Sequence, residues 1–172
     1  LRRAYWIVAG IAGGDPADIT LGSVAWADHV VDGDLGHEID AREIPADWPT
    51  GFIPLRKKTP YEKPRRADLE GELYSLNKRL VDWAFGLTKD VALGDNDRLN
   101  ERRSRYTGTP NAQGRARVMR GDTLSGSTFW HGRLLNQWAN DWVRYHTEGA
   151  GNYVTTAMED TGVMQALTFL AK

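Results

Sequence analysis

Short apolar runs alternate with longer amphipathic stretches along this chain, which is the pattern of a mixed α/β domain. The continuous apolar run at 4–9 (AYWIVA) predicts a buried strand, and a glycine-rich loop follows it at 10–15. Shorter runs predict further strands, two within 19–31 on either side of Gly22, one at 116–119 and one at 153–157.

Helical periodicity is found in two longer stretches and near the end of the chain. Residues 72–87 predict a helix whose buried face holds Leu73, Leu76, Leu80, Trp83, Ala84 and Leu87. Residues 134–146 predict a second helix, with Leu135, Trp138, Trp142 and Tyr145 on or near its buried face. A third helix is expected to begin near Met158, and the basic segment 100–106 (NERRSRY) is expected to lie in a loop.

The segment 32–71 is rich in proline, glycine and charged residues and predicts a long excursion across the surface. Loops longer than about 12–15 residues are usually functional or disordered. One interpretation is a solvated excursion held down by its aromatic side chains. The other is a wall of a ligand pocket or a subunit contact, in which His37 is the leading polar candidate.

Length and composition limit the architecture. A chain of 172 residues with 41% hydrophobic residues suits one domain with a sizeable core. The chain enters directly into a strand-like run and ends on the helical sequence MQALTFLAK, so residues 1–172 are expected to be an internal portion of a longer α/β domain. A small complete domain is the alternative.

The charge balance narrows the class of partner. The formal net charge is −1, which offers no electrostatic attraction to nucleic acid or to an anionic membrane. No apolar run approaches the ~20 residues that span a bilayer. There are no cysteines, the four histidines lack metal-ligand spacing, and neither a phosphate-loop nor a dinucleotide fingerprint is present. The sequence therefore predicts no metal and no cofactor.

Three stretches could carry chemistry, and each has a plainer alternative. In AGIAGGDP, glycines after a strand let the backbone approach a ligand, although an ordinary turn has the same composition. In SGSTFWHG, Phe129 or Trp130 could stack on a planar ring or pack in the core. In AMED, Glu159 could accept hydrogen bonds from a vicinal diol beside the Met158 thioether, or simply favour a helix N-terminus.

Taken in order, these stretches resemble a known group of proteins. GIAGGDPADITLGSVAWADHVV is similar to the glycine-rich strand of nucleoside phosphorylases and methylthioadenosine nucleosidases, SGSTFW to their S-G-D-A-F segment, and AMED to their Met-Glu ribose motif. AGIAGGDP, LGSVAWA, HEIDAREIP, FWHG and TAMED together resemble the purine nucleoside permease family more closely. The similarity covers essentially the whole chain.

The resemblance implies a three-layer α/β/α fold with a mixed, twisted central sheet, and a purine nucleoside as ligand. It implies that Glu159 binds the ribose hydroxyls and that Met158 lines the sugar, while Gly10 lies against the sugar or the position of the nucleophile. It also implies that Phe129 packs on the base, with Trp130 as its neighbour or substitute. No catalytic residue is assigned, and Glu159 is the best candidate. Related enzymes often complete their sites from a neighbouring subunit, so a homo-oligomer is a further expectation.

Two departures from the family pattern bear on the reaction. Ile11 stands where phosphorylases place a phosphate-binding Ser or Thr, and Ser127 replaces an Asp in the segment before Phe129. Cleavage of the N-glycosidic bond by water rather than by phosphate is therefore the expected activity. The alternative is a nucleoside-binding component that assists uptake without catalysis. The family's N-terminal phosphate loop and its C-terminal base-binding Asp or Asn have no counterpart within residues 1–172.

Overall fold

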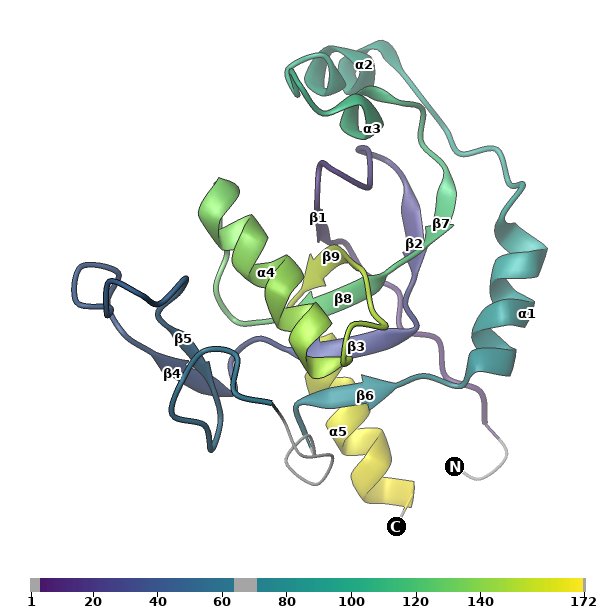
Figure 1. Ribbon diagram of the computed structural model, residues 1–172. Helices are drawn as coiled ribbons and strands as arrows, with labels where there is room; N and C mark the ends of the chain where they lie inside the picture. The colour runs from purple at the N-terminus through teal and green to yellow at the C-terminus, as the bar shows by residue number, and fades with distance from the viewer. Residues whose placement is uncertain (1–3, 64–70, 172) are drawn as a thin grey trace.

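The centre of the molecule is a mixed sheet, seen in a computed structural model that describes residues 4–63 and 71–171 (Figure 1). Five strands lie in the order β1-β9-β8-β3-β6. They are β1 (Gly13–Gly14), β9 (Tyr153–Ala157), β8 (Asp122–Ser125), β3 (His29–Asp32) and β6 (Leu73–Ser75). The middle three run parallel to one another, whereas β1 and β6 are antiparallel at the two edges. The prediction of an α/β chain with a mixed central sheet is confirmed.

Helices cover both faces of this sheet (Figure 1). In the described residues they are α1 (Lys78–Thr88), α2 (Asp97–Arg103), α3 (Pro110–Gln113), α4 (Arg133–His146) and α5 (Asp160–Ala171). Leu124 of β8 packs in the core against α4, whereas the next residue, Ser125, accepts a hydrogen bond from the Thr161 N–H of α5 at 3.3 Å. Because successive strand residues point to opposite faces, α4 and α5 lie on opposite sides of the sheet. The three-layer α/β/α expectation is confirmed.

Two small sheets lie outside the central one. β2 (Val24–Trp26) pairs in parallel with β7 (Val118–Arg120), close to the strand predicted at 116–119. β4 (Gly36–Glu38) pairs antiparallel with β5 (Phe52–Pro54) and forms a hairpin with a long connection. This hairpin belongs to the predicted excursion, which therefore has secondary structure of its own.

The excursion 32–71 is fastened to α4, although its residues 64–70 lie outside the described part of the chain. The Tyr61 hydroxyl donates a hydrogen bond to Asp141 Oδ2 on α4 at 3.0 Å. Burial, together with this carboxylate, raises the pKa of Tyr61 to about 12, so the hydroxyl keeps its proton and remains a donor. An aromatic side chain thus helps to hold the excursion against the body of the molecule.

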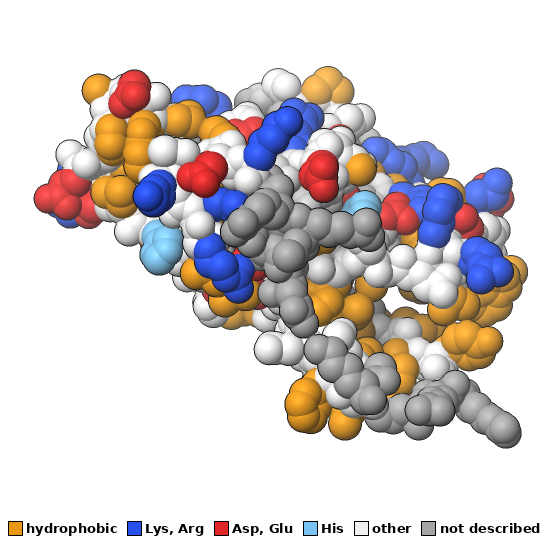
Figure 2. All heavy atoms as spheres, turned by 60° about the horizontal axis from the view of Figure 1, so that its bottom comes forward, with side chains coloured by type: hydrophobic (Ala, Val, Ile, Leu, Met, Phe, Trp, Pro, Cys, Tyr) orange, Lys and Arg blue, Asp and Glu red, His pale blue; other side chains and the backbone are white. Residues whose placement is uncertain are grey.

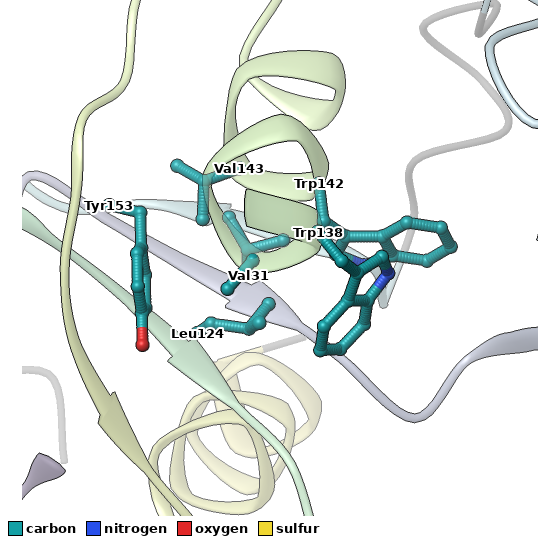
Figure 3. Packing of buried hydrophobic residues seen from close by; sticks show 7 residues of the cluster. Val31, Leu124, Trp138, Trp142, Val143 and Tyr153 are labelled. Carbon is teal, nitrogen blue, oxygen red and sulfur yellow. The ribbon is translucent and has the colours of Figure 1, made fainter. Parts of the chain in front are cut away.

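The core lies between the sheet and α4 (Figure 3). It is formed by Val31, Leu124, Trp138, Ala139, Trp142, Val143 and Tyr153. The Trp142 indole N–H donates to the Asp32 carbonyl at 2.8 Å, which fixes a ring of α4 to the last residue of β3. The helix predicted at 134–146 is confirmed as α4, and Trp138 and Trp142 are buried as expected.

A buried carboxylate joins the amino ends of the three parallel strands. Asp122, the first residue of β8, accepts hydrogen bonds from the His29 N–H at 2.7 Å and from the Asn152 N–H at 2.8 Å. It also accepts from the Asp28 N–H at 3.2 Å, and its Oδ1 lies 3.1 Å from Nδ1 of the His29 ring. One side chain therefore ties together the starts of β3, β8 and β9.

The contact between His29 and Asp122 predicts a pH-dependent contribution to stability. The hydrogen bond to Asp122 raises the pKa of His29, although burial opposes the effect. The resulting stabilisation is fully present below the unfolded pKa of about 6.5 and is lost as pH rises through the higher, folded pKa. We expect the advantage in unfolding free energy over His29→Gln to shrink as pH rises above about 6.5. Urea unfolding across this range measures it, and an advantage independent of pH would contradict the assignment.

The apolar run at 4–9 is not a buried strand, so this prediction was wrong. Tyr5, Trp6 and Ile7 are exposed, and the first strand forms only at Gly13 and Gly14. A continuous apolar run favours a strand, but a strand also needs a neighbouring strand to pair with. The neighbouring strand, β9, pairs with this part of the chain only at the two residues of β1. An apolar segment lies at the surface instead.

The helix predicted at 72–87 is divided into strand β6 and helix α1, which begins at Lys78. The Asn77 side chain accepts hydrogen bonds from two N–H groups of the first turn and caps the helix. The predicted buried face is wrong as well, because Trp83 is 63% exposed and Val81 is the buried residue of α1. The apolar residues of β6 and α1 together have a spacing that a single helix would also have, which is why one helix was predicted.

The basic segment 100–106 was predicted as a loop, but α2 occupies its first part. This helix begins at Asp97 after the capping side chain of Asn96, and it ends at Arg103. Arg103 is 2% exposed and its guanidinium donates two hydrogen bonds to the Asp95 carboxylate, at 2.6 and 2.8 Å. Arg103 is therefore buried and paired with a carboxylate, although arginine side chains are usually exposed to solvent.

The turn before β2 requires glycine. Gly22 has φ +85°, in the left-handed region that favours glycine, and a Cβ there would lie 3.3 Å from the Arg103 guanidinium. The predicted break between the two strands within 19–31 lies at residues 27–28, between β2 and β3, rather than at Gly22.

The surface mixes charges of both signs, and Figure 2 shows them interspersed on one face, with hydrophobic side chains between and beside them. Large exposed apolar side chains include Leu87 of α1 and Phe169 and Leu170 of α5. Across residues 4–63 and 71–171, no helix has both the length and the apolar character needed to cross a bilayer.

Candidate functional site

The carboxyl ends of the three parallel strands meet at one edge of the sheet. β3 ends at Asp32, β8 at Ser125 and β9 at Ala157, and these residues are partners in the strand register. Pairing continues one residue further, since the Gly33 N–H donates to the Ser125 carbonyl at 2.7 Å and the Gly126 N–H to the Ala157 carbonyl at 3.0 Å. Ligands of open α/β sheets bind at this kind of edge.

Ser127 is held by a carboxylate from the neighbouring loop. Asp34 Oδ2 accepts hydrogen bonds from the Ser127 hydroxyl at 2.7 Å and from its N–H at 2.9 Å. Asp34 is itself held in place, because Asp32 Oδ1 accepts from the Asp34 N–H at 2.8 Å. The loops after β3 and β8 are thus joined, and the hydroxyl of Ser127 is engaged in that contact.

Phe129 and Trp130 lie in different environments. Phe129 is 79% exposed in the loop between β8 and α4. Trp130 is half-buried against the core, and its ring meets that of Trp138 edge-on, with 5.5 Å between the centroids. Phe129 therefore offers an open aromatic surface, whereas Trp130 packs against the core.

Met158 and Glu159 follow β9 directly and are both exposed. The Met158 N–H donates to Glu159 Oε2 at 3.3 Å, within the short link to α5. Asp160 begins α5, and burial, with the neighbouring Glu159 charge, raises its pKa. Glu159 is thus the carboxylate of this pair that presents its oxygens to solvent at the strand edge.

Gly10 and Ile11 leave the sheet at the same edge as Met158 and Glu159. β1 runs antiparallel to β9 with Gly13 opposite Thr156, so the residues before Gly13 continue past the end of β9. Ile11 is 97% exposed, and no atom lies within 4 Å of the place where a Cβ on Gly10 would be. The structure brings these four candidates to one edge without packing them together.

A groove of about 290 Å³ lies beside this edge, between the β4–β5 hairpin, the loop after β8 and α4. Its aromatic lining is Phe52, Trp130, Trp138 and Trp142, and its polar lining includes Asp34, His37, Glu38 and Thr128. The volume is near the lower limit for small-molecule sites. Two candidates from the sequence, Trp130 and His37, are among the lining residues, but the side chain of His37 faces away from α4.

The sequence did not single out Glu38, yet its side chain faces the aromatic wall. Glu38 pairs with Phe52 across the hairpin, and Phe52 stacks on Trp138 with 4.3 Å between ring centroids. Residues that pair directly across two strands share a face, so Glu38 faces α4 whereas His37 faces the opposite side. The orientation of Glu38 follows only from the register of the β4–β5 hairpin. The sequence does not predict that register, because the connection between the two strands is long and has no short turn signature.

Comparison with known proteins decides the family. The family model described as purine nucleoside permease matches residues 1–172, the whole of this chain. The chain belongs to the purine nucleoside permease family. The closer of the two resemblances drawn from the motifs is thereby confirmed, while the wider relation to nucleoside phosphorylases stays a prediction.

Individual permeases are similar over the same region. A purine nucleoside permease of Candida albicans is 30% identical over 176 residues, which cover 100% of this chain and 43% of that protein. A probable purine nucleoside permease of Schizosaccharomyces pombe is 30% identical over 176 residues, which cover 98% of this chain and 50% of that protein. The chain thus spans half or less of the length of these relatives. No solved structure matches it.

Proposed function

We propose that this chain binds a purine nucleoside at the carboxyl edge of β3, β8 and β9 and that the bound nucleoside is destined for uptake. The observation that carries the proposal is the meeting of three candidate segments at one edge in a member of the permease family. The names of the relatives from Candida albicans and Schizosaccharomyces pombe support a nucleoside as the ligand.

Each candidate residue has a role in this proposal. The Glu159 carboxylate, an acceptor only, takes two hydrogen bonds from the ribose hydroxyls. Met158 offers its apolar side chain to the sugar face, and the open backbone at Gly10 leaves room for close approach. Phe129 and Trp130 supply the aromatic surface for the base, with Trp130 held in place by Trp138.

Uptake is favoured over the N-glycosidic cleavage that the motifs first suggested. The relatives are named permeases, and their names point to transport rather than to cleavage. The site points the same way, since Glu159 is exposed rather than enclosed with a reacting bond. Release of free purine base from a bound nucleoside would restore the cleavage hypothesis.

Glu159→Ala is expected to weaken adenosine binding by about 1.5–3 kcal/mol, the usual contribution of hydrogen bonds to a charged group. Calorimetric titration with adenosine, inosine and guanosine measures the loss. The control is Glu43→Ala, which removes an exposed carboxylate from the excursion, away from the strand edge. Unchanged affinity in Glu159→Ala, or equal binding of ribo- and 2′-deoxyribonucleosides, would contradict the role of Glu159. Uptake of labelled adenosine by cells that make the protein tests the transport part.

A further inference from the structure

The groove beside the strand edge is a formed cavity with a rigid aromatic wall. Phe52 stacks on Trp138, and Trp130 meets the same ring edge-on, so three rings support one another from three different elements. Gly126 forms part of the lining, and a Cβ there would lie 3.3 Å from Asp34 Oδ1 and 3.6 Å from the Trp130 ring. The backbone at Gly126 therefore approaches both a carboxylate and an aromatic side chain.

The polar lining of the groove is acidic. Asp34 and Glu38 are its carboxylates, and no Lys or Arg is among its lining residues in the described part of the chain. The Asp34 carboxylate is engaged with Ser127, whereas the side-chain carboxylate of Glu38 forms no hydrogen bond or ion pair within residues 4–63 and 71–171. Glu38 is thus an acceptor available to a ligand, beside aromatic surface that suits a planar ring.

We propose that this groove holds the purine base and that Glu38 selects which purine is bound. The inference rests on the proposed nucleoside function and adds a specificity-determining residue to it. Neighbouring strands lie about 4.8 Å apart, so the ends of β3 and β9 are roughly 10 Å apart across β8. That distance suits a nucleoside whose base lies beside the β4–β5 hairpin and whose ribose lies toward Glu159.

A carboxylate can only accept hydrogen bonds, and this determines the preferred base. The guanine edge offers two adjacent donors, the N1–H and the exocyclic amine, which match the two oxygens of Glu38. The adenine edge offers one donor beside the N1 lone pair, which a carboxylate repels. The groove therefore prefers guanosine to adenosine, with inosine, which has one donor at N1, between them.

The experiment is a calorimetric titration of the protein and of Glu38→Gln with guanosine, inosine and adenosine. The protein is expected to bind guanosine about tenfold more tightly than adenosine, as one good bidentate contact allows. Glutamine presents one acceptor and one donor, the complement of the adenine edge, so Glu38→Gln should reverse the preference. The matched control, Glu43→Gln, makes the same charge change on the same excursion and should leave the preference unaltered.

A second measurement locates the base. Guanosine should shift the NMR resonances of the Gly36 and Gly126 amides, which line the groove, more than that of Gly86 within α1. If nucleosides bind and Glu159→Ala weakens them, but Glu38→Gln leaves the ratio unchanged, the groove assignment is wrong and the proposed function stands. If no nucleoside binds, both are overturned.

Discussion

Replacing Trp142 by alanine is expected to lower the free energy of unfolding by about 3–5 kcal/mol, the usual cost of truncating a large buried aromatic side chain. Trp142 is 4% exposed and lies in the core with Trp138, at 5.8 Å between ring centroids. Its loss would also leave the Asp32 carbonyl without the indole N–H that it accepts. Urea or thermal unfolding measures the change.

The matched control for this prediction is Trp83→Ala, which makes the same chemical change on an exposed surface of α1. Surface substitutions usually alter stability by less than about 0.5 kcal/mol. Trp142→Phe should lie between the two, because it keeps one ring in the core but removes both the N–H donor and the volume of the second ring, at a cost of about 1–3 kcal/mol. Equal, small effects of Trp142→Ala and Trp83→Ala would show that the core is not where the structure has it.

Asp122→Ala is expected to cost about 3–5 kcal/mol, as breaking a buried charged network by removing one partner does. The carboxylate accepts from three backbone N–H groups, those of Asp28, His29 and Asn152. Alanine cannot accept any of these hydrogen bonds, and the strand starts of β3 and β9 would lose their shared anchor. Asp122 lies at the amino ends of the strands, opposite the proposed ligand site. Its replacement should therefore affect ligand binding only indirectly, by destabilising the strands.

Two variants test that interpretation of Asp122. Asp47→Ala removes an exposed carboxylate and should leave stability within about 0.5 kcal/mol. Asp122→Asn keeps the size of the side chain and one acceptor oxygen, and it should fall between the other two. If Asp122→Asn were as stable as the parent, the negative charge would have no part in holding the strands.

The predictions from the sequence were most accurate for elements whose structure depends mainly on the residues within the element itself. α4 repeats apolar residues over fourteen positions, and β9 is a short run of residues with high strand propensity, YVTTA, that ends before Met158. Both were predicted almost to the residue. The order of strands and helices, and from it the fold class, followed from these elements because each is long or sharply bounded.

Predictions failed where the outcome depended on distant residues. Whether the run at 4–9 becomes a strand depends on a partner edge, and the face that α1 buries depends on what packs against it. Arg103 could be predicted as exposed from its type, but its burial depends on Asp95 and on the fold around it. The caps Asn77 and Asn96 are local signals, but they were not recognised, since the first helix was predicted from residue 72 and no helix was predicted after Asn96.

The candidate site shows the same division. Motif order led to Met158 and Glu159, and the strand register brings them to the edge where β8 also ends. Glu38 could not be found this way, because its relation to Phe52 depends on the pairing of two strands separated by a long connection. A residue's part in a groove built from three separate elements is a property of the tertiary fold.

The surface segment at 5–8 bears on how molecules of this chain meet one another. Tyr5, Trp6, Ile7 and Val8 are uncharged, have high strand propensity and are open to solvent. An exposed segment of this composition is a hazard for intermolecular strand pairing, and the hazard grows as the protein is concentrated. Since hydrophobic association weakens on cooling, we expect cold and dilute solutions to keep this chain dispersed.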